Sequence, residues 1–446
     1  MLEFLTLFLG IVAGAQEVQL AADPEVSSVE LRLDGRLLGT LTESPWHGEV
    51  DLGPKILPHR LEAIGLDSEG SEVGRTSQAL NVPRPAAEVA LALEHSEGRL
   101  TGARVAWESA LARRPDGMRV QLDGADVPVL PGDRVDLSGV DEDRPHVLQA
   151  TLSFTGSPDA QSLILFGGGY IGEARADLTA WPVRLGKGKH KVENMRGWFS
   201  DGNEDIRAVA VEKGPASLII VRSPGVATAL RGLSGRPDAY AGRGTGIGPI
   251  ADRAVASGAD RERSSLPLGD DLRARLLVSR SLREMGQQVD YDLFSISPEL
   301  TERDGGLFWV LTREVAIGGP ASRVRVADAV TSAGLQAAAS NHRRGVLLVL
   351  AEPWEDASRF SVASVREYLS ALGVPLVVWR LGRESVVAPQ WGDGPSLGEF
   401  PELKRAWRDF QKELERQRVV WLEGNHLPNA VELTTRAGAT ALTSGG

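Results

Sequence analysis

An acidic loop follows the most apolar stretch of the chain. Residues 346–350 read VLLVL, and Glu352, Glu355 and Asp356 come directly after them. Carboxylate oxygens grouped in this way suit a hard divalent cation, or the acid and base of a hydrolase. The alternative is a solvated loop whose negative charges complement the N-terminus of the following helix. We favour this second interpretation, because negative side chains at this position complement the positive end of the helix dipole.

Other patterns that could carry chemistry are absent or have simpler explanations. The sequence contains no P-loop, no H-E-x-x-H motif, no G-x-S-x-G elbow and no EF-hand loop. The glycine-rich run 242–248 does not stand between a strand and a helix, so it is interpreted as a flexible loop rather than a nucleotide site. Gly167–Gly169 is interpreted as a break at a sheet edge. His59 and His146 are single histidines without clustered ligands, which favours a structural role.

The composition limits the classes of partner and chemistry. The 446 residues carry a net charge of −11 and no cysteine. The missing cysteines exclude disulfides, thiolate metal sites and a cysteine nucleophile. The sequence has no cluster of Lys and Arg of the kind that nonspecific binding to nucleic acid or to an anionic membrane requires.

The N-terminus resembles a secretory signal. Residues 4–12 are largely apolar, and Ala13-Gly14-Ala15 has the small-x-small form of a cleavage site before Gln16. The alternative is a buried first strand or a membrane anchor, although the apolar run is short for a membrane span. We predict a signal peptide over residues 1–15, a secreted or periplasmic protein, and no membrane insertion after cleavage.

The elements around the acidic loop predict an α/β sheet. The unbroken apolar runs 346–350 and 375–381 suit strands covered on both faces, and a helix pattern lies between them. A strand, a helix and a strand in this order imply a right-handed parallel crossover. In such doubly wound sheets, the loops at the carboxyl ends of the strands hold ligands.

The N-terminal half predicts two β-sandwiches in tandem. Strand patterns, an Asp-Gly turn and a Pro-His strand start recur in the same order, the second set 85–89 residues after the first. His59 and His146 are equivalent positions in this repeat. We predict immunoglobulin-like sandwiches over residues 16–84 and 85–183.

An α/β domain is expected over residues 184–433, with a long exposed loop at about 232–272 and a disordered tail at 434–446. Further strands are expected near residues 276–278, 307–311 and 419–422. The expected helices cover residues 326–340 and 402–416.

This third domain resembles a von Willebrand factor type A domain of the divergent bacterial exported kind. The resemblance rests on the run 217–221 (SLIIV), the helix and strand within 327–350, and the acidic loop with its following Ala357-Ser358. It implies a doubly wound fold and a metal-ion-dependent adhesion site. In that site, an Asp-x-Ser-x-Ser loop, a threonine and a later aspartate hold a divalent cation that a partner's carboxylate completes.

The residues at these positions predict that the cation site is degenerate. The first loop reads Arg222-Ser223-Pro224-Gly225-Val226, so an arginine replaces the first carboxylate and the loop keeps none of its ligands. The threonine position falls on or near Val324, and the later position is Glu352. One carboxylate beside an arginine does not hold Mg²⁺, and we expect Arg222 to pair with Glu352. These departures from the family pattern therefore predict a fold of this type without a metal or cofactor.

These observations predict an exported, non-enzymatic adhesion-type protein that binds a protein partner. Candidate contacts are Trp354, Glu355, Asp356 and the loop around Tyr240. One alternative is a hydrolase that uses an acidic cleft at the sheet top. A second is a carbohydrate-binding module with Trp46, Trp107 or Trp181 as its stacking platform, although these side chains also suit sandwich cores.

Overall fold

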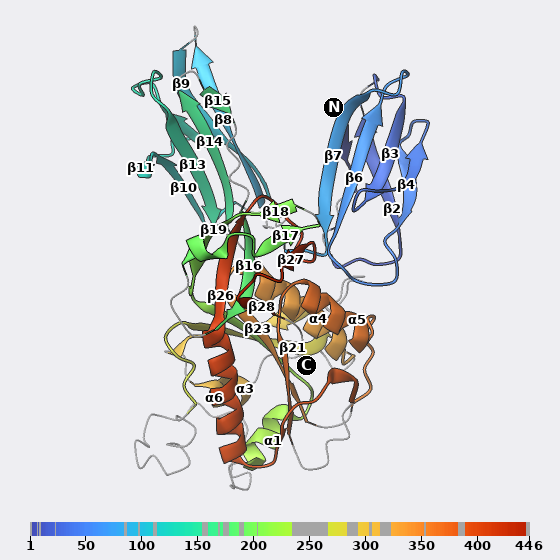
Figure 1. Cartoon of the computed structure of the whole chain (residues 1–446), viewed down its shortest axis with the longest axis vertical. Helices are drawn as coiled ribbons and strands as arrows, with labels where there is room; N and C mark the ends of the chain where they lie inside the picture. The colour runs from blue at the N-terminus through green and yellow to red at the C-terminus, as the bar shows by residue number, and fades with distance from the viewer. Residues whose placement is uncertain are drawn as a thin grey trace, which may run out of the picture. The chain divides into compact units, whose positions relative to one another are not determined.

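The computed structural model describes most of the chain, in two compact units. The first comprises residues 1–82, 180–422 and 426–446, and the second comprises residues 83–179 and 423–425. Figure 1 shows the elements of both. The described residues are 2–6, 8, 10–22, 24–83, 87–96, 99–109, 114–153, 159–167, 170–172, 178–186, 191–202, 204–233, 266–282, 293–302, 306–312, 323–351, 354–381 and 389–442.

The first unit begins with a β-sandwich. Its sheets have the orders β1-β2-β5 and β4-β3-β6-β7, and their inner faces enclose a core that includes Trp46. Alternation places Val29, Leu31 and Leu33 on the buried face of β3. The strands are β1 (Leu2–Phe4), β2 (Ala15–Ala22), β3 (Ser28–Leu33), β4 (Arg36–Leu41), β5 (His47–Asp51), β6 (His59–Leu66) and β7 (Glu72–Leu80).

Part of the expected signal peptide belongs to this sandwich. Leu2–Phe4 forms β1, which pairs antiparallel with residues 20–22 of β2, and the Leu2 side chain is buried. This is the buried first strand that the sequence offered as an alternative. Cleavage after Ala15 would remove β1 from the sheet, and export stays a prediction.

The second unit is also a β-sandwich. Its sheets have the orders β11-β10-β13-β14-β15 and β12-β9-β8, around a core of its own. The strands are β8 (Ala87–Ser96), β9 (Arg99–Ser109), β10 (Gly117–Leu122), β11 (Ala125–Val127), β12 (Arg134–Asp136), β13 (His146–Ser153), β14 (Ala160–Gly167) and β15 (Tyr170–Gly172).

The predicted repeat is present and explains both histidines. His59 begins β6 and His146 begins β13, and each ring Nδ1 lies 2.7 Å from the carboxylate of a hairpin aspartate, Asp34 or Asp123. Both aspartates have φ near 50°, and a glycine with positive φ follows each, as a two-residue hairpin turn requires. The histidines therefore clamp equivalent turns in the two sandwiches.

We expect replacement of Asp123 by Asn to lower the pKa of His146. The hydrogen bond with Asp123 raises the pKa of His146, and the same bond lowers the pKa of Asp123. The pair therefore stabilises the fold most between about pH 4 and 6.5, and its contribution is lost as the pH falls through the Asp123 pKa or rises through the His146 pKa. Asparagine tolerates the left-handed backbone, so the turn survives.

NMR titration of the histidine ring signals checks this expectation. The Asp126→Asn variant is the control, because the exposed Asp126 pairs with Arg119 rather than with a histidine. An unchanged His146 pKa in Asp123→Asn contradicts the clamp.

The α/β domain contains a six-stranded sheet of order β22-β21-β20-β23-β24-β25. All neighbours from β21 to β25 pair in parallel, and β22 is antiparallel at one edge. The predicted crossover is present as β23, α5 and β24. The strands are β20 (Ala216–Arg222), β21 (Leu272–Leu282), β22 (Leu293–Ile296), β23 (Arg343–Leu350), β24 (Leu376–Leu381) and β25 (Ser396–Leu397).

Helices cover both faces of this sheet, so β23 is buried along its whole length. α4 (Val326–Ala339) and α5 (Val362–Ala371) share one core with the sheet. α1 (Val226–Leu233), α3 (Leu307–Thr312) and α6 (Phe400–Arg416) share the core on the other face. Within the same unit, Tyr368 of α5 donates a hydrogen bond to Asn81 O (2.9 Å).

One predicted strand is wrong. Residues 307–311 form helix α3, in which Leu307, Phe308, Val310 and Leu311 are buried while Trp309 is 46% exposed. The buried positions have the spacing of one helical face. A short apolar run in the sequence does not distinguish a strand from a buried helix.

Seven strands form a third β module that the sequence did not predict. They come from both sides of the α/β domain, in the orders β19-β26-β16-β28 and β18-β17-β27, and enclose a core of their own. The strands are β16 (Leu178–Leu185), β17 (Phe199–Asp201), β18 (Glu204–Ile206), β19 (Ala208–Glu212), β26 (Gln417–Glu423), β27 (Val431–Leu433) and β28 (Ala439–Ala441). The short η1 (Val192–Met195) lies between β16 and β17, and η3 (Pro389–Trp391) precedes β25.

This module corrects three predictions. The second sandwich was predicted to extend to residue 183, but residues 178–185 form β16 of the module. The strand predicted at 419–422 belongs to it rather than to the α/β sheet. The tail predicted to be disordered includes β28, which pairs with β16, and Leu442, which is buried. The tail is polar and small, but pairing satisfies its backbone groups and Leu442 anchors it.

Candidate functional site

The carboxyl edge of the α/β sheet carries a crevice of about 470 Å³. The loop 222–226, the first turns of α1 and the end of β21 line it, at the edge where doubly wound sheets hold ligands. Its lining residues are Arg222, Ser223, Pro224, Gly225, Val226, Ala227, Thr228, Arg231, Val278, Ser279 and Arg280. Three guanidinium groups and no carboxylate belong to this described lining.

Backbone contacts hold the first loop in place. Arg222 Nη1 donates to Leu311 O (2.6 Å), and Arg222 O accepts a hydrogen bond from Ser279 Oγ (2.8 Å). Gly225 has a φ of +79°, which lets the chain turn into α1. The arginine is therefore a fixed part of the sheet top.

The one hydroxyl in the predicted cation loop is used internally. Ser223 is buried, and its Oγ accepts a hydrogen bond from the amide of Ala351 (3.0 Å) at the end of β23. Pro224 offers no side-chain oxygen, and the apolar Val226 is fully buried. Among the described residues, no group of three or more His, Cys, Asp or Glu side chains is placed to hold a metal ion.

The remaining predicted cation positions are only partly within the described residues. Val324 forms a β-bridge with Arg280, and its carbonyl accepts a hydrogen bond from Ala357 N (2.8 Å). Glu352 lies outside the described residues, as does Tyr240. The predicted pairing of Arg222 with Glu352 therefore stays a prediction.

Asp356 acts as a helix cap, although for a different helix from the expected one. Its Oδ1 accepts hydrogen bonds from Val326 N (3.1 Å) and from Ser358, so it caps α4 rather than the following α5. The side chain of Ser361 caps α5 instead. The sheet brings the start of α4 beside this loop. This contact was not predictable, because the two segments are 30 residues apart in the sequence.

The two other candidate contacts differ in exposure. Glu355 is exposed. Trp354 is only partly exposed and packs against the core beneath α4 and α5, and its Nε1 is buried without a hydrogen-bond partner among the described residues. Trp354 is therefore mainly a packing residue.

The tryptophans proposed as a carbohydrate platform contribute to cores. Trp46 and Trp181 are buried, and Trp181 meets the ring of Phe199 edge to face. Trp107 is partly buried, and its Nε1 donates to the carboxylate of Asp133 (3.1 Å). All three side chains pack against sandwich or module cores.

Arg231 and Arg280 were not singled out from the sequence. Arg280 lies toward the end of β21, after the long loop predicted at about 232–272, and Arg231 lies on α1. The parallel pairing of β20 with β21 brings Arg280 beside Arg222, whereas Arg231 lies on α1, which follows the loop 222–226 directly. In the described part of the chain, no helix is long and apolar enough to span a membrane.

Comparison with known proteins gives no family. No family model matches the chain, and no curated protein matches it. Among solved structures, fibronectin(III)-like modules of Clostridium thermocellum CbhA match over 18% of this chain and 93% of theirs, at 19% identity and a TM-score of 0.17. The central fibronectin-III array of RIM-binding protein matches over 43% and 67%, at 13% identity and a TM-score of 0.21. Human COPII-coat protein Sec24c matches over 52% and 44%, at 8% identity and a TM-score of 0.27.

Proposed function

We propose that this chain is an exported, non-enzymatic binding protein with a von Willebrand factor A-like domain. The crevice at its sheet top would hold an acidic segment of a protein partner directly on arginine side chains. The observation that carries the proposal is the set of three arginines, Arg222, Arg231 and Arg280, around one crevice at the carboxyl edge of the sheet.

Charge and geometry support direct binding of carboxylates. In the adhesion site that the resemblance implies, a cation bridges protein and partner carboxylates. Here guanidinium groups would supply the positive charge, and a guanidinium such as that of Arg280 can bind a carboxylate through two parallel hydrogen bonds. The hydroxyl of Ser223, which lies in the same loop, accepts a hydrogen bond from the amide of Ala351. The proposal therefore needs no metal.

The Arg280→Gln variant tests the proposal with a synthetic peptide of alternating Asp and Glu as the probe. We expect wild-type binding to persist in a chelator, and Arg280→Gln to weaken it about 10- to 100-fold, the loss of a charge-assisted hydrogen bond of about 1.5–3 kcal/mol. Biolayer interferometry at physiological salt measures both affinities.

Arg273→Gln is the matched control, because Arg273 lies at the other end of the same strand and pairs with Glu299 (3.5 Å). Equal losses in the two variants would show general charge attraction and refute the crevice. Scanning fluorimetry with Mg²⁺, Mn²⁺ and chelator adds a second readout. A clear metal-dependent rise in melting temperature contradicts the metal-free site.

A further inference from the structure

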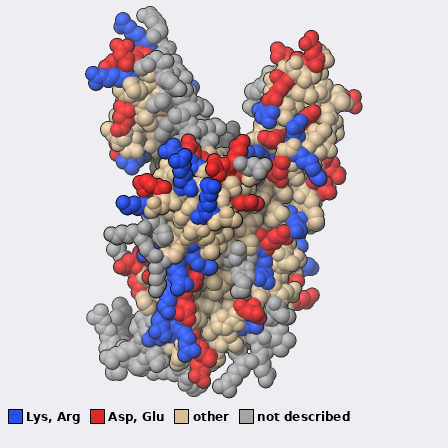
Figure 2. Space-filling view, viewed as in Figure 1, with Lys and Arg blue, Asp and Glu red and all other residues tan. Residues whose placement is uncertain are grey.

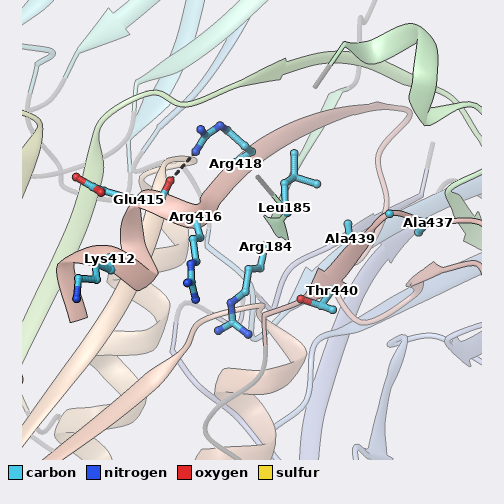
Figure 3. A pocket seen from close by; sticks show the side chains of 11 residues that line it. Arg184, Leu185, Lys412, Glu415, Arg416, Arg418, Ala437, Ala439 and Thr440 are labelled. Carbon is cyan, nitrogen blue, oxygen red and sulfur yellow. Dashed lines mark hydrogen bonds between the residues drawn. The ribbon is translucent and has the colours of Figure 1, made fainter. Parts of the chain in front are cut away.

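A second cavity, of about 830 Å³, lies where α6 ends and the third β module begins. The end of β16, the last turns of α6, the start of β26 and the segment 437–440 around β28 line it (Figure 3). Ala437, Gly438 and Ala439 contribute only small residues to the lining. We call this cavity the basic pocket.

Four cationic side chains and one carboxylate line the basic pocket. The cations are Arg184, Lys412, Arg416 and Arg418, and the carboxylate is Glu415. Lys412 and Arg416 lie one turn apart on α6, where positive charge complements a helix C-terminus. That effect does not account for Arg184, which comes from a strand more than 220 residues earlier in the sequence.

One carboxylate outside the lining orients two of these guanidiniums. Glu413 lies 3.0 Å from Arg184 Nε and accepts a hydrogen bond from Arg416 Nη1 (2.8 Å). Figure 3 shows the two arginine side chains extending in the same direction. A single carboxylate between two guanidiniums leaves one positive charge in excess.

Arg418 adds a cation whose described hydrogen bonds go to carbonyl oxygens. Its Nη1 donates to Glu415 O (2.7 Å) and to Gln417 O (2.6 Å). Burial lowers the pKa of Arg418, and the charge of nearby Arg343 lowers it further. A bound anion would therefore stabilise the charged form of Arg418.

The surface around the pocket is basic as well. Lys404, Arg408, Lys412 and Arg416 follow one another at four-residue spacing along α6. Figure 2 shows Lys and Arg gathered along this part of the surface. This stripe stands in a chain whose net charge is −11. At low salt it would attract anions to the pocket, and physiological salt largely screens those of its members that lie outside the lining.

From this geometry we infer that the basic pocket binds a ligand that carries two or more phosphate groups. The guanidinium fork matches phosphate oxygens. Lys412, whose ammonium also pairs with the exposed Asp409 (3.0 Å), adds a point charge. The volume exceeds what a single phosphate fills, and the cations lie on several elements around it. The site is separate from the sheet-top crevice and shares no lining residue with it.

Isothermal titration calorimetry with inorganic pyrophosphate tests the inference on the full chain. We expect the Arg184→Gln, Arg416→Gln double variant to weaken binding at least 10-fold at physiological salt. Arg408→Gln, one turn before Lys412 and outside the pocket lining, should stay within 2-fold of the wild type. Arg280→Gln should also stay within 2-fold, which separates this site from the proposed sheet-top site.

A second experiment, binding to lipid vesicles, distinguishes a lipid headgroup from a soluble phosphate ligand. Sedimentation with phosphatidylglycerol vesicles, competed by pyrophosphate and reduced in the double variant, supports a lipid headgroup in this pocket. Pyrophosphate binding without vesicle binding supports a soluble ligand. The inference is overturned if the wild type binds neither probe, or if Arg408→Gln loses as much affinity as the double variant. Circular dichroism confirms that each variant is folded.

Discussion

The Arg343→Met variant should lose about 3–5 kcal/mol of stability. Arg343 begins the central strand β23 and is 1% exposed. Its guanidinium donates to Gly214 O (2.9 Å) and Leu414 O (3.0 Å), and pairs with the carboxylate of Asp271 (2.5 Å). Methionine fills a similar volume but leaves both carbonyls without this donor. Urea unfolding followed by tryptophan fluorescence measures the change.

The expected loss comes mainly from the carbonyls. Asp271 is half exposed and also pairs with Lys213 (3.3 Å), so it keeps water and one partner when Arg343 is removed. Burial raises the pKa of Asp271, but the hydrogen bonds and charges of Arg343 and Lys213 outweigh burial and hold that pKa below its usual value. The stabilisation from Asp271 is therefore present above about pH 4 and is lost as the pH falls through its folded pKa.

Lys213→Met is the control for Arg343. It removes the exposed partner of the same carboxylate and should cost at most about 1 kcal/mol. An Arg343→Met variant as stable as the wild type would mean that other donors reach Gly214 O and Leu414 O, and would refute the proposed role.

The Trp407→Ala variant should lose a similar amount, about 3–5 kcal/mol. Trp407 lies on the buried face of α6, meets Trp379 edge to face at 6.4 Å and stacks on Phe410 at 5.8 Å. Its Nε1 also donates to Pro267 O (2.8 Å). Alanine would leave a cavity between α6 and the sheet. Thermal unfolding by circular dichroism measures the loss.

Two further variants separate the contributions of Trp407. Trp407→Phe keeps most of the packing, and Pro267 O retains a hydrogen bond from Gln411 Nε2 (3.0 Å). This variant should therefore lose only about 1–2 kcal/mol of stability. Arg408→Ala, on the exposed side of the same helix, should stay within about 0.5 kcal/mol of the wild type. A small loss in Trp407→Ala would show that this face of α6 is loosely packed.

Local sequence patterns predicted the elements whose contacts repeat along the chain. The helix pattern of α6 places Leu403, Trp407, Phe410 and Leu414 on one face, and all four are buried. The Asp-Gly turn with its distant Pro-His strand start predicted two equivalent sandwiches. These signals depend only on periodicity and on turn chemistry, so the sequence alone carries them.

Long-range pairing was not predictable in the same way. β16 pairs with β28 across more than 250 residues, and no local pattern states which strands are neighbours. The same limit applies to both sites. Arg280 joins Arg222 through the β20–β21 pairing, and Arg184 joins Arg416 because β16 is the sheet neighbour of β26, which follows α6. Asp356 was assigned to the wrong helix for this reason.

The third β module has a consequence for how the α/β domain is attached. β19 ends at Glu212, β26 starts at Gln417, and the two strands are antiparallel neighbours with Glu212 opposite Val419. The α/β domain therefore lies between the end of β19 and the start of β26, two paired antiparallel strands that a short turn could otherwise connect. It is an insertion between the strands of a hairpin. A force pulling on the chain outside this hairpin would act on the hydrogen bonds between β19 and β26 before it acted on the inserted domain. During evolution, the inserted α/β domain could be exchanged or lost while the third β module is kept.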